Sequence, residues 1–193
     1  MRAAIAPLLR PNRPAPTLCL MRMTQAIYIG AALLVGFGSA VQVGMIGSLG
    51  RQRGAFEATL ISMLASVLGL AAFLVIRALR SEPPQLPSPM NEPLVYVVLG
   101  GVATVALVVS MRGLQPYLSA AGLFGFLYVV SAAFLAPRIG IALYVSAVTA
   151  GTLIGSVALD HLGAFGAEMQ RVTLVRGLGL LALILGVVLV RGR

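Results

Sequence analysis

The chain has 193 residues, of which 59% are hydrophobic and only 10% are charged, and its formal net charge is +9. A soluble domain of this length cannot cover its surface with so few polar side chains. The composition therefore excludes an ordinary soluble protein. It indicates an all-α integral membrane protein, because helices satisfy their own backbone hydrogen bonds in lipid, and membrane lipid is the first expected partner.

The positive charge does not indicate nucleic acid as a partner. All 14 basic residues are arginines, and beyond the N-terminal segment they stand singly or in pairs between apolar runs. This spacing is typical of anchors that flank membrane spans, whereas nucleic-acid-binding proteins cluster basic residues on one face.

Residues 1–23 form a basic, proline-rich leader without acidic residues. It lacks the unbroken apolar core of a signal peptide. We interpret it as a disordered tail or as the result of a start codon assigned too early, since Met21 and Met23 directly precede the first hydrophobic run. The single cysteine, Cys19, excludes an internal disulfide, and the sequence predicts neither a metal site nor a cofactor.

Residues 24–193 are predicted to form one transmembrane helical domain. The second and third hydrophobic runs are separated by a linker at 80–93 that contains five prolines and cannot be helical throughout. Runs long enough to cross about 30 Å of hydrocarbon recur along the chain, and together they predict a polytopic helical bundle: 26–47, 55–78, 94–111, 117–136, 139–159 and 174–190.

The fifth run has two distinct faces on a helical wheel. One is a polar stripe, and the opposite one consists of small residues with the spacing that lets helices approach closely in lipid. The polar stripe suggests a solute pathway, although Ser and Thr hydroxyls can instead bond to carbonyls of their own helix. The polar stripe contains Ser146, Thr149, Thr152, Ser156 and Asp160, and the packing stripe contains Ala147, Gly151 and Gly155.

Two other runs carry polar or aromatic residues on one face. Tyr28, Ser39 and Gln42 share a face of the first run, while Tyr128 and Ser131 share a face of the fourth. Gln42 is the most informative of them, because a carboxamide within an apolar span needs a partner or water. An uncharged cavity and a simple interhelical hydrogen bond both remain open for it.

Charged residues lie near the ends of the predicted spans. Glu57 lies near the start of the second run, where an acidic side chain is stabilised by the positive end of the helix dipole. We interpret Arg138 as an interfacial anchor, and Pro137 beside it as the residue that fixes the turn. Asp160 and His161 stand where the fifth run ends, before Gly163. They form either a structural turn or a pH-sensitive gate, since histidine titrates near neutral pH.

The stretch from Phe124 to Gly166, with the Gln42 helix and the closing run GLGLLALILGVVLV, resembles the YdcZ-type branch of the drug/metabolite transporter superfamily. This resemblance implies a bacterial inner-membrane protein of five family-like helices, solute transport, and an antiparallel pair of subunits. The chain differs from the family at Thr152, where a glutamine is usual. It also has an extra hydrophobic segment at 94–111, which is a sixth span, a re-entrant segment or a surface helix.

Two functions from different classes follow. The first is a secondary transporter of small organic solutes, drugs or metabolites that works by alternating access. The alternative is a non-transporting subunit that stabilises or regulates a paired membrane protein. For either function we expect a homodimer or a heterodimer with a related membrane protein. An enzyme is not expected, because no nucleophile is accompanied by an aligned base.

The arginines also bear on orientation. With six spans, nine arginines lie on the side of the N-terminus and five on the other, which places the N-terminus in the cytoplasm. If translation starts at Met23, the count becomes five against five, and the chain is expected to insert both ways as an antiparallel homodimer.

Overall fold

The computed structural model describes residues 15–80, 87–170 and 173–191. In these ranges the chain is helical, which confirms the predicted polytopic bundle. Five segments, formed by α1, α2, α3, η1 with α4, and α5, are long and apolar enough to cross a membrane, while the apolar stretch of α6 is shorter. The elements are α1 (Ala15–Arg53), α2 (Ala55–Leu79), α3 (Pro93–Ser110), η1 (Pro116–Ala120), α4 (Ala121–Ile139), α5 (Ile141–Leu162), η2 (Ala164–Gly166) and α6 (Leu174–Arg191).

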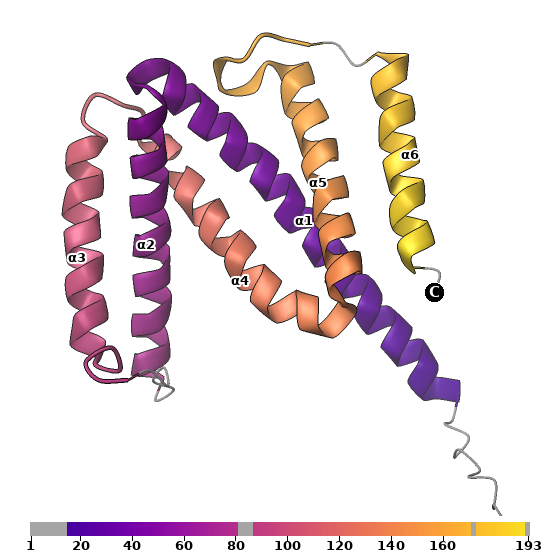
Figure 1. The fold of residues 1–193 in the computed structure, drawn as a ribbon, viewed down its shortest axis with the longest axis horizontal. Helices are drawn as coiled ribbons and strands as arrows, with labels where there is room; N and C mark the ends of the chain where they lie inside the picture. Colours follow the sequence, from indigo (N-terminus) through magenta and orange to yellow (C-terminus); the bar gives the residue numbers. More distant parts are fainter. Residues whose placement is uncertain (1–14, 81–86, 171–172, 192–193) are drawn as a thin grey trace, which may run out of the picture.

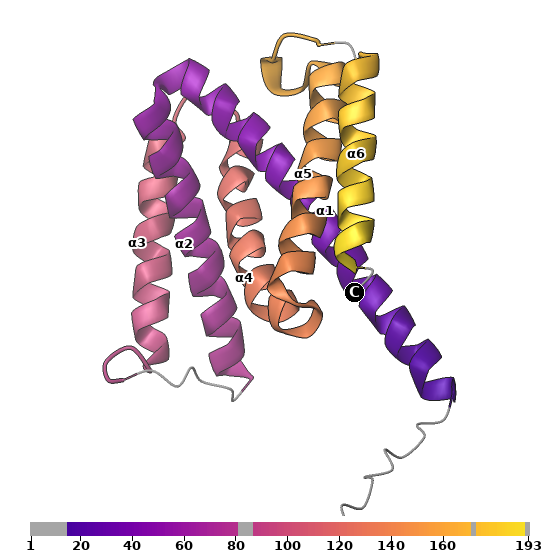
Figure 2. The same cartoon turned by 45° about the vertical axis from the view of Figure 1, so that its right-hand side comes forward.

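The helices run in alternating directions, and α1 and α4 both run obliquely through the middle of the bundle (Figure 1). The pair of α2 and α3 lies on one side, and the pair of α5 and α6 lies on the other (Figure 2). α1 packs most extensively on α5, and α2 packs between α3 and α4. The long, tilted α1 therefore joins the two sides.

Apolar side chains form the core and also most of the outer surface. One buried cluster centres on Leu49, Ile61 and Leu118, and a second joins Ala32 to Tyr144 and neighbouring residues of α5. Large apolar side chains are also exposed on the outward faces of every α-helix. This distribution fits a protein whose outer solvent is lipid.

The extra hydrophobic segment forms α3. This helix has 18 residues and lies antiparallel beside α2 along its length (Figures 1 and 2). A helix that lay on the membrane surface would cross its neighbours at a steep angle. The arrangement therefore favours the sixth-span interpretation among the three that the sequence left open.

Two boundaries differ from the sequence-based prediction. α1 begins at Ala15 and so includes residues 15–23, because Pro16 falls in the first turn, where proline is tolerated. The earlier part of the predicted disordered leader, residues 1–14, lies outside the described residues, as does part of the linker, 81–86. Pro137 lies inside α4 rather than in the turn.

The turns before α2 and α5 are single residues, Gly54 and Gly140. Their φ values are 98° and 90°, a region that residues with a Cβ rarely adopt. Each glycine reverses the chain at once, and this places α1 beside α2 and α4 beside α5.

Candidate functional site

A cavity of about 300 Å³ lies between α1, α5 and the η2 loop, and we call it the α1–α5 cavity. Its polar lining comes from two helices that are far apart in the sequence. Apolar side chains, including Val43 and Leu159, form most of the remaining wall. The polar lining consists of Arg51 from α1 with Thr152, Ser156 and Asp160 from α5.

Both hydroxyl groups in the α1–α5 cavity donate to carbonyls of their own helix. The Thr152 Oγ1 donates to the Val148 carbonyl at 2.9 Å, and the Ser156 Oγ donates to the Leu153 carbonyl at 3.0 Å. These bonds match the self-bonding alternative, yet both residues also line the cavity. Because each hydroxyl has one hydrogen and two lone pairs, its oxygen remains an acceptor for a solute N–H or O–H.

Arg51 and Phe165 close one side of the α1–α5 cavity. The Arg51 Nη2 donates to the Phe165 carbonyl at 2.6 Å, and the Phe165 ring lies against Gly44, where an added Cβ would be 2.6 Å from Cδ2. Phe165 has a φ of 57°, unusual for a residue with a Cβ. By its position in the sequence, Arg51 is expected only to flank the end of a span. Phe165 was not predicted, and its one sequence signal is its position between Gly163 and Gly166.

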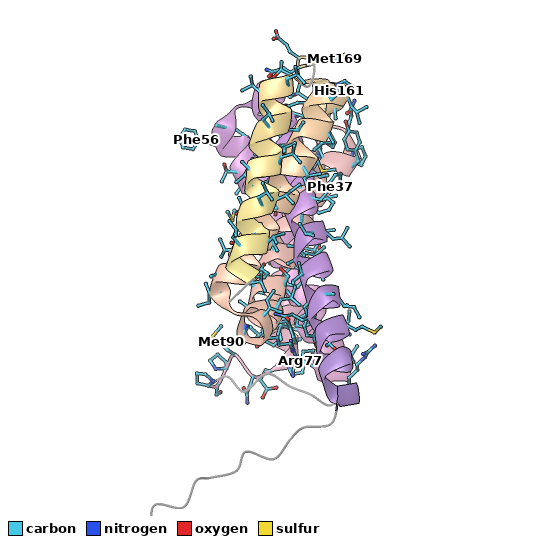
Figure 3. The ribbon with its side chains drawn as sticks, turned by 90° about the vertical axis from the view of Figure 1, so that its right-hand side faces the viewer. Phe37, Phe56, Arg77, Met90, His161 and Met169 are labelled. Carbon is cyan, nitrogen blue, oxygen red and sulfur yellow. The ribbon has the colours of Figure 1, made fainter. Side chains whose placement is uncertain are left out.

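Asp160 and His161 lie in the last turn of α5, which ends at Gly163 in a left-handed conformation. The Asp160 carbonyl accepts hydrogen bonds from the backbone N–H of Gly163 at 3.2 Å and of Gln170 at 2.9 Å. Figure 3 shows His161 at this end of the bundle, where its side chain is exposed. The backbone bonds describe a structural turn, and Asp160 also lines the cavity. Within the described ranges, no three His, Cys, Asp or Glu residues are grouped as a metal site would require.

The small-residue stripe of α5 packs on α1. Ala147, Gly151 and Gly155 are buried, and a Cβ added at Gly151 would overlap the Leu33 carbonyl oxygen. A Cβ added at Gly155 would lie 2.9 Å from the Cβ of Ala40. The small-xxx-small spacing thus lies where the backbones of α1 and α5 approach closely.

The polar residues of α1 occupy three different surroundings. Tyr28 lies beneath the Arg138 guanidinium, 5.9 Å from the ring centroid, and the Ser39 Oγ donates to the Val35 carbonyl at 3.1 Å. Gln42 faces α4, where a Cβ added at Gly125 would lie 2.8 Å from the Gln42 Nε2. These residues share a helix face but do not form one polar surface with α5.

Tyr128 and Ser131 of α4 form a hydrogen-bonded group with a buried tyrosine of α5. The Ser131 Oγ lies 2.7 Å from the Tyr144 hydroxyl, which lies 3.4 Å from the Tyr128 carbonyl. Sequence reasoning missed Tyr144, because a tyrosine in an apolar span gives no sign of its partner. The bond ties α4 to α5.

Ser146 and Thr149 line a separate cavity of about 320 Å³ between α5 and α6. The predicted polar stripe of α5 is therefore divided, with Thr152, Ser156 and Asp160 facing α1. Gln42 and Tyr128 line neither of these two cavities. A helical wheel treats the stripe as one surface, whereas two neighbouring helices share it.

The chain matches the model of a known protein family. The family model described as "Putative inner membrane exporter, YdcZ" matches residues 27–121 and 110–189. No curated protein and no solved structure matches the chain.

Proposed function

The chain belongs to the YdcZ family of inner-membrane exporters, and from this premise we propose that it carries a small organic solute across the membrane by alternating access. The family establishes a multi-pass inner-membrane transport protein. The observation that supports the finer proposal is the α1–α5 cavity, where hydroxyl, carboxyl and guanidinium groups lie within an otherwise apolar bundle.

The chemistry of the lining limits the solute. Thr152 and Ser156 use their hydrogens within α5, so toward the cavity they offer acceptors only. The surrounding wall is apolar, and the volume of about 300 Å³ admits a molecule of metabolite size. We expect a solute with N–H or O–H donors on an apolar body.

Untargeted export from proteoliposomes tests the proposal. Vesicles are loaded with the fraction of a bacterial cell extract below roughly 500 Da, a range that suits a pocket of this size, and released compounds are identified by mass spectrometry. We expect at least one compound to leave faster than from empty liposomes. Release equal to that from empty liposomes would contradict transport and favour the non-transporting subunit.

Thr152→Val assigns the flux to the α1–α5 cavity, because it removes the hydroxyl and nearly preserves the shape. The loss of one hydrogen bond should reduce flux at low solute concentration by about 3- to 10-fold. Thr104→Val is the matched control, since Thr104 makes the same bond to its own helix, at 2.7 Å, on an exposed face of α3. Equal flux in the two variants would exclude Thr152 from the solute site.

A further inference from the structure

The two halves of the chain have the same order of elements. α1, Gly54, α2 and α3 are followed by α4, Gly140, α5 and α6, and both α3 and α6 have 18 residues. The connecting glycines have similar backbone angles, φ 98° and ψ 161° at Gly54 and φ 90° and ψ 145° at Gly140. Because each half has three helices, the second half runs in the opposite sense to the first (Figure 1).

The close helix contacts also repeat, at positions 86 residues apart like the two connecting glycines. Gly36 lies against α5, where an added Cβ would be 2.9 Å from the amide nitrogen of Thr152. Gly122 lies against α2, where an added Cβ would be 2.7 Å from the amide nitrogen of Ser66. Gly36 and Gly122 are 86 residues apart, and so are Ser66 and Thr152. Both partners of one contact therefore have counterparts in the other contact.

A second pair of contacts follows the same rule. A Cβ at Gly155 would lie 2.9 Å from Ala40, and a Cβ at Gly69 would lie 3.2 Å from Phe126. Gly69 and Gly155 are again 86 residues apart, as are Ala40 and Phe126. The α1–α5 and α2–α4 interfaces are therefore equivalent.

The equivalent positions Gly38 and Phe124 meet each other. A Cβ added at Gly38 would lie 2.9 Å from Phe124 Cδ1. Contact between a residue and its own counterpart occurs only near a two-fold axis. The pseudo-two-fold axis therefore passes between α1 and α4, close to Gly38 and Phe124.

The two equivalent interfaces differ in what fills them. Ala40 and Leu159 line the α1–α5 cavity, and their counterparts in the α2–α4 interface are Phe126 and Phe73. The two phenyl rings lie 6.0 Å apart between centroids, at an interplanar angle of 58°. Aromatic rings thus occupy the place that is equivalent to the cavity.

We propose that the α2–α4 interface is the second gate of the transport route, closed by Phe73 and Phe126 in this structure and opening toward the opposite face of the membrane from the α1–α5 cavity. The proposal rests on the proposed function, and it assigns the α1–α5 cavity and the α2–α4 interface as the two exits of the transport route. Figure 3 shows the ends that they serve, with His161 at one end of the bundle and Arg77, four residues after Phe73, at the other.

Gln42 supplies a polar group beside the closed gate. A Cβ at Gly125 would lie 2.8 Å from the Gln42 Nε2 and 3.4 Å from the Ser66 Oγ, so both side chains face the same glycine. The Ser66 hydroxyl donates to the Gly122 carbonyl at 2.7 Å, whereas the half-buried Gln42 carboxamide has no hydrogen-bond partner among the described residues. The carboxamide is available to a solute that passes from one interface to the other.

One chain then provides both inverted halves. An antiparallel pair of subunits, as the family resemblance implies, is one way to obtain two equivalent gates of opposite orientation. Here the two-fold relation lies between α1–α3 and α4–α6 of the same subunit. The route needs no second copy in the opposite orientation.

Thiol accessibility tests this route without any knowledge of the solute. In a Cys19→Ser background, Thr152→Cys and Ser66→Cys report on equivalent positions of the two interfaces. Sealed vesicles are treated with the membrane-impermeant reagent trimethylammonium-ethyl methanethiosulfonate. External protease then removes a C-terminal tag only from chains whose C-terminus is outside the vesicle. Labelling is measured separately in chains with a cleaved tag and in chains with a protected tag, so both insertion directions can be interpreted.

We expect Thr152→Cys to react in chains whose tag is protected, because the α1–α5 cavity lies at the end opposite the C-terminus. Ser66→Cys should be protected on both sides. Adding Phe126→Ala should raise its reaction rate by about tenfold in chains whose tag is cleaved, as expected when a closed interface loses an aromatic contact. Phe134→Ala, on the exposed surface of α4, is the matched control and should leave Ser66→Cys protected.

Two results would overturn the second gate. One is continued protection of Ser66→Cys after Phe126→Ala, and the other is reaction from the same side as Thr152→Cys. Phe73→Ala repeats the test if Phe126→Ala does not accumulate in the membrane. If no compound is exported but the cysteines react as expected, transport alone is refuted. If export occurs but Ser66→Cys stays protected after Phe126→Ala, the proposed route alone is refuted.

Discussion

Gly151→Ala places one methyl group where α1 and α5 are in backbone contact. The added Cβ would lie 2.8 Å from the carbonyl carbon and 3.0 Å from the Cα of Leu33. The nearest atom is the Leu33 carbonyl oxygen, 2.0 Å from the added Cβ. Ordinary contact begins at about 3.4 Å, so the helices must separate locally by about 1.4 Å. A gap of more than about 1 Å forfeits at least about half of the dispersion energy of the neighbouring contacts.

The expected cost follows from what the methyl group meets. Overpacking typically destabilises a core by about 1–3 kcal/mol. Leu33 presents backbone atoms, which cannot rotate away as a flexible side chain can, so we expect a cost near the upper limit, about 3 kcal/mol. For a chain of this length the melting temperature should fall by about 6–12 °C.

Thermal unfolding of the purified protein in detergent, followed by size-exclusion chromatography, measures this effect. Gly101→Ala is the matched control, because nothing lies within 4 Å of a Cβ added at that position. Thr152→Ser should also be nearly neutral, since it retains the hydroxyl. If Gly151→Ala and Gly101→Ala have the same melting temperature, the contact between α1 and α5 at this stripe is not as close as we describe.

Two further predictions concern the α4–α5 contact and the orientation of the chain. Tyr144→Phe removes the hydroxyl that forms a hydrogen bond with Ser131 at 2.7 Å. It should lower the free energy of unfolding by about 0.6–2 kcal/mol, a typical range for interhelical hydrogen bonds in membranes. An unchanged melting temperature would show that this hydrogen bond does not stabilise the fold. C-terminal fusions to a reporter active only in the cytoplasm and to one active only outside should give a single cytoplasmic C-terminus for the full chain, by the count of nine arginines against five. The form that begins at Met23 should give both signals, and a single strong orientation for it would reject dual insertion.

The sequence alone predicted the membrane environment and the helices, because both depend on local composition. Long apolar runs must be helical in lipid, and arginines between them mark the span ends. The sequence also predicted a closely packed face on α5. Ala147, Gly151 and Gly155 are four residues apart, and in a helix this spacing places them on the same face.

The contacts between helices select which polar residues lie together, and these contacts cannot be derived from one helix at a time. The wheel placed Thr149 with Thr152, but α6 covers the first and α1 covers the second. Gln42 and Tyr128 likewise lie apart from the α1–α5 cavity, because a helical wheel gives directions around one axis and says nothing of the neighbouring helix.

The inverted relation between the two halves also required the structure. Few residues are identical at positions 86 apart, and the glycines among them include Gly54 and Gly140. In lipid many apolar side chains can replace one another without changing the fold, whereas a glycine is required where backbones touch or φ is positive. The sequence therefore shows that the chain spans the membrane as helices, whereas the packing of α1 against α5 forms the α1–α5 cavity and selects the residues that line it.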